Sequence, residues 1–86
     1  MNGEALITAG DVQAARGDWE AAARRYASVA AILDDEEVTP RALEKAYEAY
    51  QKLGKEPEAK KALNALQSRY PEYFQKKKAA APKQKP

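Results

Sequence analysis

Thr39–Pro71, TPRALEKAYEAYQKLGKEPEAKKALNALQSRYP, is the stretch that decides the fold, because it contains the start, the turn and the end of a helix pair. Thr39 and Pro40 are expected to open the first helix, since threonine caps free N–H groups and proline suits the first helical position. Gly54 is expected to end that helix, because glycine adopts positive φ without steric cost. Pro57 then starts a second helix, which runs to the final proline of the stretch.

Apolar residues recur at helical spacing in both halves of this stretch. The first half places on one face Leu43, Ala46, Tyr47, Tyr50 and Leu53. The second half places on one face Ala59, Ala62, Leu63, Leu66 and Tyr70. Steps of three and four residues put each set on one side of a helix. The stretch therefore predicts two amphipathic helices joined by a tight turn.

The residues before this stretch predict a second helix pair. A helix is expected over residues 4–16, with an inner side formed by Leu6, Ala9, Gly10 and either Val12 or Gln13. Gly17 should end this helix and Asp18 should cap the next one. The apolar stripe of that next helix, in which we interpret Trp19 as a core residue, consists of Trp19, Ala22, Ala23, Tyr26, Val29, Ala30 and Leu33. Residues 34–38 are expected to form an acidic loop, since adjacent carboxylates oppose the dipole at a helix C-terminus.

Composition limits both the size of the core and the available chemistry. A chain of 86 residues makes at most one small domain, and alanine supplies half of its hydrophobic residues, so the helices must pack closely around a thin core. The absence of cysteine and histidine excludes thiol chemistry and removes the commonest general base and nitrogen ligand. No apolar run approaches the ~18 residues that span a bilayer. The first residues lack the pattern of a secretory signal.

Carboxylates are the remaining candidates for catalysis or metal binding. The acidic run of residues 34–37 lacks the alternating ligands, central glycine and distal glutamate of a calcium loop, so we interpret it as a solvated loop. Glu44 and Glu48 are four residues apart on one helical face, but a general acid and base would need a pocket that this small domain can hardly enclose. We therefore predict no enzyme activity, no metal site and no cofactor.

The charge of the chain is divided unevenly along its length. Residues 1–75 contain ten basic and thirteen acidic side chains, whereas residues 76–86, KKKAAAPKQKP, contain five lysines and no acid. This tail is expected to be disordered. A contact with nucleic-acid phosphates or an anionic membrane is the alternative to a solubilising or linker role. We favour the linker role, because the tail has no arginine and no aromatic residue after Phe74.

The two halves of the chain align with each other when Gly17 is placed on Gly54. The offset is 37 residues, a period of 34 plus three extra residues in the acidic loop. The alignment matches Leu6 with Leu43, Ala9 with Ala46, Ala22 with Ala59, Tyr26 with Leu63, and Val29 with Leu66. Small residues recur where two helices must cross closely, as an internal repeat requires.

Over residues 4–71 the chain resembles the tetratricopeptide repeat family. The second copy matches the family pattern at Leu43, Ala46, Tyr50, Gly54, Glu58, Ala59 and Pro71. The first copy matches it at Leu6, Gly10, Gly17, Asp18, Trp19, Ala22 and Tyr26. The pattern is broken at Gln13, where an aromatic is usual, at Tyr47, where glycine is usual, and at Asp34, where proline is usual. The second copy looks most like bacterial envelope repeats, such as those at the end of the Tol-Pal coordinator proteins.

The resemblance implies an all-α fold of two antiparallel helix-turn-helix repeats, four helices in total, stacked as a short right-handed solenoid. Repeat one would cover residues 4–34 and repeat two residues 39–71. An aromatic cap at residues 72–75, where Tyr73 and Phe74 fold against the last helix, and an N-terminal extension at residues 1–3 would flank them. In this family the first helix of each repeat lines the concave face. Carried over, that face consists of Glu4, Ile7, Asp11, Ala14, Ala15, Arg41, Glu44, Glu48, Gln51 and Lys52.

The expected function is a non-catalytic protein–protein interaction module, an adaptor or scaffold. Its concave face should bind a peptide or helix that is apolar with some positive charge. The alternative is a structural domain that forms a homodimer or belongs to a longer repeat array, because two repeats fall below the three usually needed for stability. A complete chain would be cytoplasmic, and a fragment would suit the bacterial envelope or periplasm.

Overall fold

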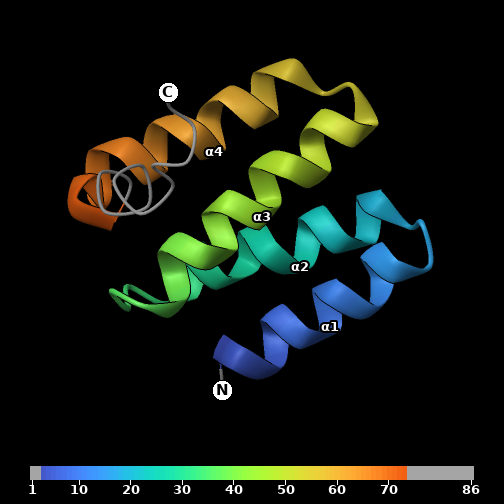
Figure 1. Ribbon diagram of the computed structural model, residues 1–86, viewed down its shortest axis with the longest axis horizontal. Coiled ribbons are helices and arrows are strands. Elements are labelled where there is room, and N and C mark those ends of the chain that lie inside the picture. The colour runs from blue at the N-terminus through green and yellow to red at the C-terminus, as the bar shows by residue number, and fades with distance from the viewer. Residues whose placement is uncertain (1–2, 74–86) are drawn as a thin grey trace, which may run out of the picture.

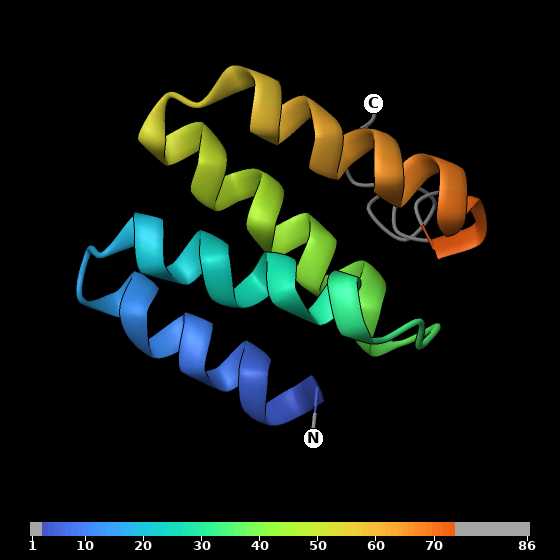
Figure 2. The ribbon, with the colours of Figure 1, turned by 180° about the vertical axis from the view of Figure 1, so that it is seen from behind.

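The computed structural model describes residues 3–73, which form four helices and no strand. The helices are α1 (Gly3–Ala15), α2 (Trp19–Ile32), α3 (Val38–Leu53) and α4 (Glu56–Arg69), and one further helical turn covers residues 71–73. Consecutive helices run in opposite directions, as the ribbon shows from the front and from behind (Figure 1, Figure 2). α1 and α2 form a first hairpin, α3 and α4 form a second, and the two hairpins meet mainly where α2 packs on α3. The all-α prediction is confirmed for the described residues.

The two hairpins turn in the same way. Gly17 and Gly54 have φ angles of 82° and 74°, in the left-handed region that glycine adopts freely. In each turn the glycine N–H donates to the carbonyl three residues before it, and the following N–H donates to the carbonyl five residues before it. This pattern satisfies carbonyl groups that a helix end leaves without partners. The same geometry therefore recurs 37 residues apart, and both predicted helix ends are confirmed.

The start of α3 differs from the prediction. Thr39 does not cap this helix, because it lies inside the first turn, completely buried. Its hydroxyl donates to the Leu33 carbonyl (3.2 Å) and accepts from the Asp35 N–H (2.9 Å). The carboxylate of Asp35 takes the capping role, because it accepts from the N–H groups of Glu37 (2.8 Å) and Val38 (2.9 Å). The loop therefore folds back on itself through short-range hydrogen bonds.

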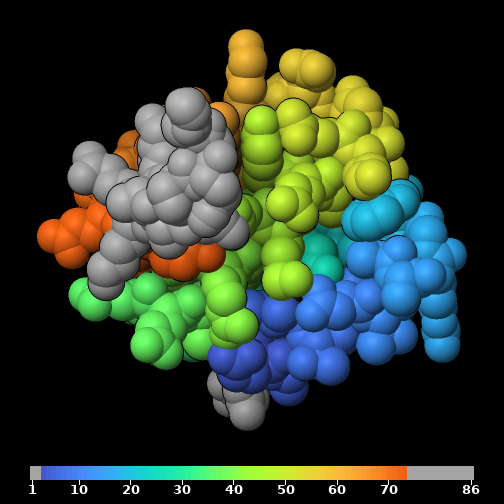
Figure 3. All heavy atoms as spheres, viewed as in Figure 1, coloured from blue at the N-terminus to red at the C-terminus, as the bar shows by residue number. Residues whose placement is uncertain are grey.

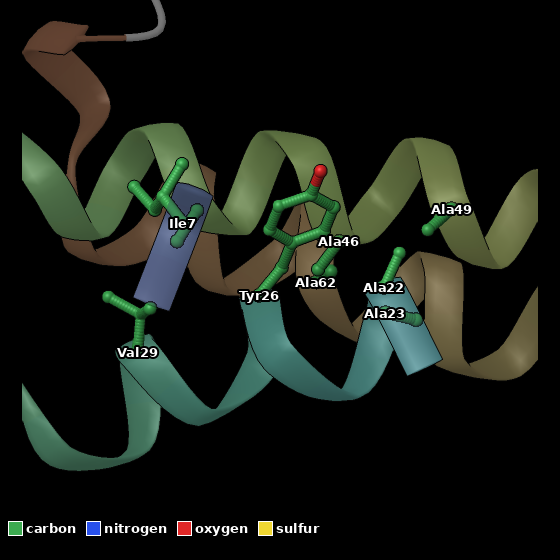
Figure 4. Close-up of a cluster of buried hydrophobic side chains, with 9 residues drawn as sticks. Ile7, Ala22, Ala23, Tyr26, Val29, Ala46, Ala49 and Ala62 are labelled. Atoms are coloured by element: carbon green, nitrogen blue, oxygen red, sulfur yellow. The ribbon is translucent and has the colours of Figure 1, made fainter. Parts of the chain in front are cut away.

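The core is thin and rich in alanine, as the composition predicts. Its larger cluster consists of Ile7, Ala22, Ala23, Tyr26, Val29, Ala42, Ala46, Ala49 and Ala62. Figure 4 shows the ring of Tyr26 standing among alanines of several helices. A second cluster at the C-terminal end joins Leu43, Leu66 and Tyr70, with Tyr73 packed against it. Tyr73 is the one residue of the predicted aromatic cap in this contact, and Phe74 and the lysine tail lie outside the described residues.

The position of α1 corrects three predictions. Ile7, which the repeat resemblance places on the concave face, is only 3% exposed and belongs to the core. Gly3, predicted in an N-terminal extension, is the first residue of α1 and is also buried. Val12, a candidate for the inner side, is 45% exposed. The reason is that α1 has apolar residues on two neighbouring sides. The sequence pattern alone does not distinguish the stripe of Gly3, Ile7 and Gly10, which is buried, from the stripe of Leu6, Ala9 and the polar Gln13.

Candidate functional site

One face of the molecule is formed by α1 and α3, whose side chains meet there (Figure 3). Arg41 of α3 pairs with Glu4 of α1. One turn further along α3, Nζ of Lys45 lies 3.2 Å from Asp11 of α1. Three of the predicted concave-face residues therefore come together, in ion pairs that join the first hairpin to the second.

Asp11 also accepts a hydrogen bond from the hydroxyl of Tyr26, which reaches this face from α2. Burial, and after it the hydrogen bond to Asp11, raises the pKa of Tyr26 far above its usual range. The phenol therefore remains a neutral donor at physiological pH. Nζ of Lys45 lies 5.9 Å from the centroid of the same ring, close enough for a cation–π contact. Tyr26, Asp11 and Lys45 form a node that links three helices, and its arrangement is that of a structural contact.

The predicted residues on the rest of α3 each meet a neighbour within the chain, with one exception. Glu44 accepts from the Tyr73 hydroxyl (3.0 Å), and Gln51 donates to the Tyr47 hydroxyl (3.0 Å). Nζ of Lys52 lies 5.4 Å from the centroid of the half-buried Trp19 ring. The exception is Glu48, one turn after Glu44, whose side chain is exposed.

The carboxylate of Glu48 forms no hydrogen bond or ion pair with any side chain between residues 3 and 73. On α1, Ala14 is half-buried and Ala15 is exposed. The predicted residues thus extend along two helices and do not converge on one pocket. Such an arrangement suits a long ligand such as a helix or an extended peptide better than a small molecule.

A groove lies at the end of the molecule opposite the two glycine turns. We call it the acidic groove. Its volume is about 850 Å³, and it is lined by Glu4, Asp34, Glu36, Glu37, Arg41, Arg69, Tyr70, Pro71, Glu72 and Tyr73. Five of these side chains are carboxylates and two are guanidinium groups. Only Glu4 and Arg41 among them were predicted as part of a binding face.

Asp34 attaches the acidic loop to the end of α4. Its carboxylate accepts from the Tyr70 hydroxyl and lies 3.4 Å from Arg69. The Tyr70 hydrogen bond, assisted by Arg69 and opposed by desolvation, lowers the pKa of Asp34. Burial and the bond to Asp34 raise the pKa of Tyr70. Asp35 also has a lowered pKa, because the N–H groups of Val38 and Glu37 stabilise its charged form.

Sequence reasoning missed Lys45, Asp34 and Asp35. For Lys45 a signal was present in the spacing of charges. Lys45 follows Arg41 by four residues, about one helical turn, and Asp11 follows Glu4 by seven residues, about two turns. Two cations on one side of α3 could therefore have been matched with two acids on one side of α1. For Asp35 the signal was an acidic side chain shortly before a helix. The partner of Asp34 is 36 residues away, and no local pattern reveals such a contact.

Residues 3–73 contain neither a metal-binding cluster nor a membrane-spanning helix. No three acidic side chains there are grouped so that they would hold a metal ion. None of the four helices is long and apolar enough to cross a membrane. No protein family, curated protein or solved structure matches the chain.

Proposed function

We propose that this chain is a non-catalytic protein-interaction module, an adaptor or scaffold, which binds a peptide or helix of a partner along the face formed by α1 and α3. In this proposal the two hairpins are tetratricopeptide-like repeats stacked as a short right-handed solenoid. Support comes from the identical turns at Gly17 and Gly54, and from the position of Gly10 against the ring of Tyr26, where the family pattern has a small residue and an aromatic.

The observation that carries the proposal is the unpaired carboxylate of Glu48 on an otherwise internally bonded face. The acids of α1 already face cations, since Glu4 pairs with Arg41 and Asp11 with Lys45. Glu48 is exposed between them and the C-terminal end of α3, where it offers a charge for a partner to neutralise. A partner with a basic group beside an apolar surface fits this face, as electrostatic complementarity requires.

Charge reversal at Glu48 tests the proposal. Glu44 is a poorer choice, because its replacement also removes the bond from Tyr73. Glu48→Lys should weaken retention of the partner by roughly tenfold or more, because like charges across an interface cost several kcal/mol and each ~1.4 kcal/mol is tenfold. The measurement is quantitative affinity capture with the full chain as bait. Glu20→Lys, an exposed change on α2, is the matched control and should retain the partner.

A partner retained equally by the wild-type chain, Glu48→Lys and Glu20→Lys would contradict binding on this face. Circular dichroism of all three proteins tests whether the substitutions leave the helices intact. Any loss of binding then reports on the surface and not on the fold.

A second candidate function, homo-oligomerisation or stacking within a longer repeat array, is supported by a different observation. Val12 of α1 and Ile32 of α2 are 45% and 53% exposed, the large hydrophobic side chains that the described residues leave in water. Sedimentation of the wild-type chain and of the Val12→Gln, Ile32→Gln double variant tests this function. A wild-type dimer that the double variant converts to monomer supports it, and a wild-type monomer at every concentration contradicts it.

A further inference from the structure

The acidic groove has more negative charge than its own cations neutralise. Arg41 pairs with Glu4, and Arg69 lies beside Asp34. The other three lining carboxylates have no cationic partner among residues 3–73, and all three are exposed: Glu36, Glu37 and Glu72. A groove of about 850 Å³ with three uncompensated carboxylates favours a cationic occupant.

A cationic segment follows a groove-lining residue directly in the sequence. Tyr73 lines the groove, and Lys76 follows it by three residues. Because an extended chain spans at most ~3.5 Å per residue, the tether from Tyr73 limits the reach of the chain to about 10 Å at Lys76 and about 18 Å at Lys78. Residues 76–86 contain five lysines and no acid, so the segment has the charge that the groove lacks.

We propose that the lysine-rich segment 76–86 occupies the acidic groove of the same chain, with its ammonium groups beside Glu36, Glu37 and Glu72. Each exposed ion pair of this kind is weak, and salt screens it. The short tether compensates for this weakness, because it gives the segment an effective concentration in the millimolar range. The lysines therefore act as an internal ligand that any other basic segment must displace. This proposal does not depend on binding of a partner to α1 and α3.

The first test compares the full chain with a full-length variant in which the five tail lysines are glutamine: Lys76, Lys77, Lys78, Lys83 and Lys85. In low salt, the backbone amide NMR signals of residues 34–37 and of Glu72 should differ between the two proteins. Added sodium chloride should move the wild-type signals toward those of the variant. Signals from the Gly17 turn, at the opposite end of the molecule, should be the same in both. Identical groove signals in low salt would overturn the proposal.

Matched controls separate a specific contact from a general change of charge. Lys60→Gln combined with Lys61→Gln removes exposed lysines from α4 and should leave the groove signals unchanged. Reversing the groove with Glu36→Lys, Glu37→Lys and Glu72→Lys should abolish the effect of the tail. Replacing the tail lysines with glutamate in that reversed protein should restore it.

The same spectra distinguish an internal contact from one between two copies. Groove signals that are independent of protein concentration support occupancy within one chain. Signals that change with concentration, together with a sedimentation coefficient that rises in parallel, would overturn it in favour of exchange between copies.

Discussion

The two hairpins have turns of the same geometry but differ in the contact between their two helices, which we call the seam. In the first, Gly10 on α1 lies directly against Tyr26 on α2, so that a Cβ at Gly10 would stand 2.5 Å from Cε1 of the ring. The aligned positions of the second hairpin, 37 residues later, are Tyr47 on α3 and Leu63 on α4. The large aromatic side chain has therefore moved from the second helix of the pair to the first.

The different position of the aromatic side chain is accompanied by a difference in packing between the two hairpins. The first seam is closed by the contact of Tyr26 with Gly10, whereas the second retains a cleft of about 260 Å³ lined in part by Tyr47 and Leu63. α4 is held instead near its C-terminal end, by the cluster that contains Leu66. The two hairpins therefore share the geometry of their turn and differ in how completely the large side chain at the helix crossing fills the space between the helices.

The largest effect should come from adding one carbon to the closed seam. Gly10→Ala is expected to lower the free energy of unfolding by about 1–3 kcal/mol, the usual cost of overpacking, although alanine gains ~1 kcal/mol of helix propensity. Urea denaturation measures the change. Thr8→Ala, on the exposed side of the same helix, should stay within about 0.5 kcal/mol of wild type. A Gly10→Ala protein more stable than wild type would show that the contact with Tyr26 is loose.

The next effect concerns the hydroxyl group of the tyrosine that lies between the two helices of each hairpin, Tyr26 in the first and Tyr47 in the second. Tyr26→Phe removes the hydrogen bond to Asp11 and should cost about 1–2 kcal/mol, because bonds to charged groups are the stronger ones. Tyr47→Phe removes only an exposed bond from Gln51 and should be nearly neutral. Thermal and urea unfolding of the two variants provide the comparison. Equal losses would mean that the tyrosines are equivalent in the two hairpins.

Filling the open seam should have a smaller effect of opposite sign. Leu63→Phe places a larger side chain beside the cleft and is expected to stabilise the protein by about 0.5–1 kcal/mol. Leu66→Phe is the matched control, because Leu66 is only 3% exposed and has no cleft beside it, so this change should destabilise. Both values come from urea midpoints at constant slope. Destabilisation by Leu63→Phe would indicate that the cleft is already closed in solution.

The smallest effect concerns the loop between the hairpins and depends on pH. The pKa of Asp35 is lowered in the folded state, so its contribution to stability is fully present above the unfolded value of ~3.9 and is lost as the pH falls below it. Asp35→Ala should therefore lower the Tm at neutral pH, and the difference from wild type should shrink as the solution is acidified. Glu36→Ala, at a side chain that caps nothing, should change the Tm little at any pH. A constant difference across the acid range would contradict the capping role.

Local patterns predicted most of the helical framework. The stripe from Trp19 to Leu33, the stripe of α4 and the two turn glycines were all read correctly, because each depends on residues within one or two turns. Asp18 was likewise correctly identified as the cap of α2, where it accepts from Ala21. The failures occurred where two local interpretations were equally good: α1 has two apolar stripes, and Thr39 and Asp35 are both able to cap α3.

The candidate site was harder to predict, because its contacts join distant parts of the chain. The predicted acids of α1, Glu4 and Asp11, lie where α1 meets α3, and each is paired with a cation of α3, Arg41 or Lys45. The acidic loop was interpreted as solvated, yet two of its carboxylates are bound to Tyr70 and to the start of α3. Helical periodicity reports which residues share a face. It does not report which charges that face already satisfies.

The complete burial of Thr39 has a consequence for the binding of other molecules. This side chain ties the loop to the start of α3 where no water reaches it, and Pro40 beside it is buried as well. Together with the packing of α2 on α3, these contacts restrict bending between the two hairpins. Anything that contacts both hairpins at once therefore encounters a preorganised surface, and association does not pay the entropy of aligning them. Substitutions that loosen Thr39 should weaken such an association without altering a single contacting residue.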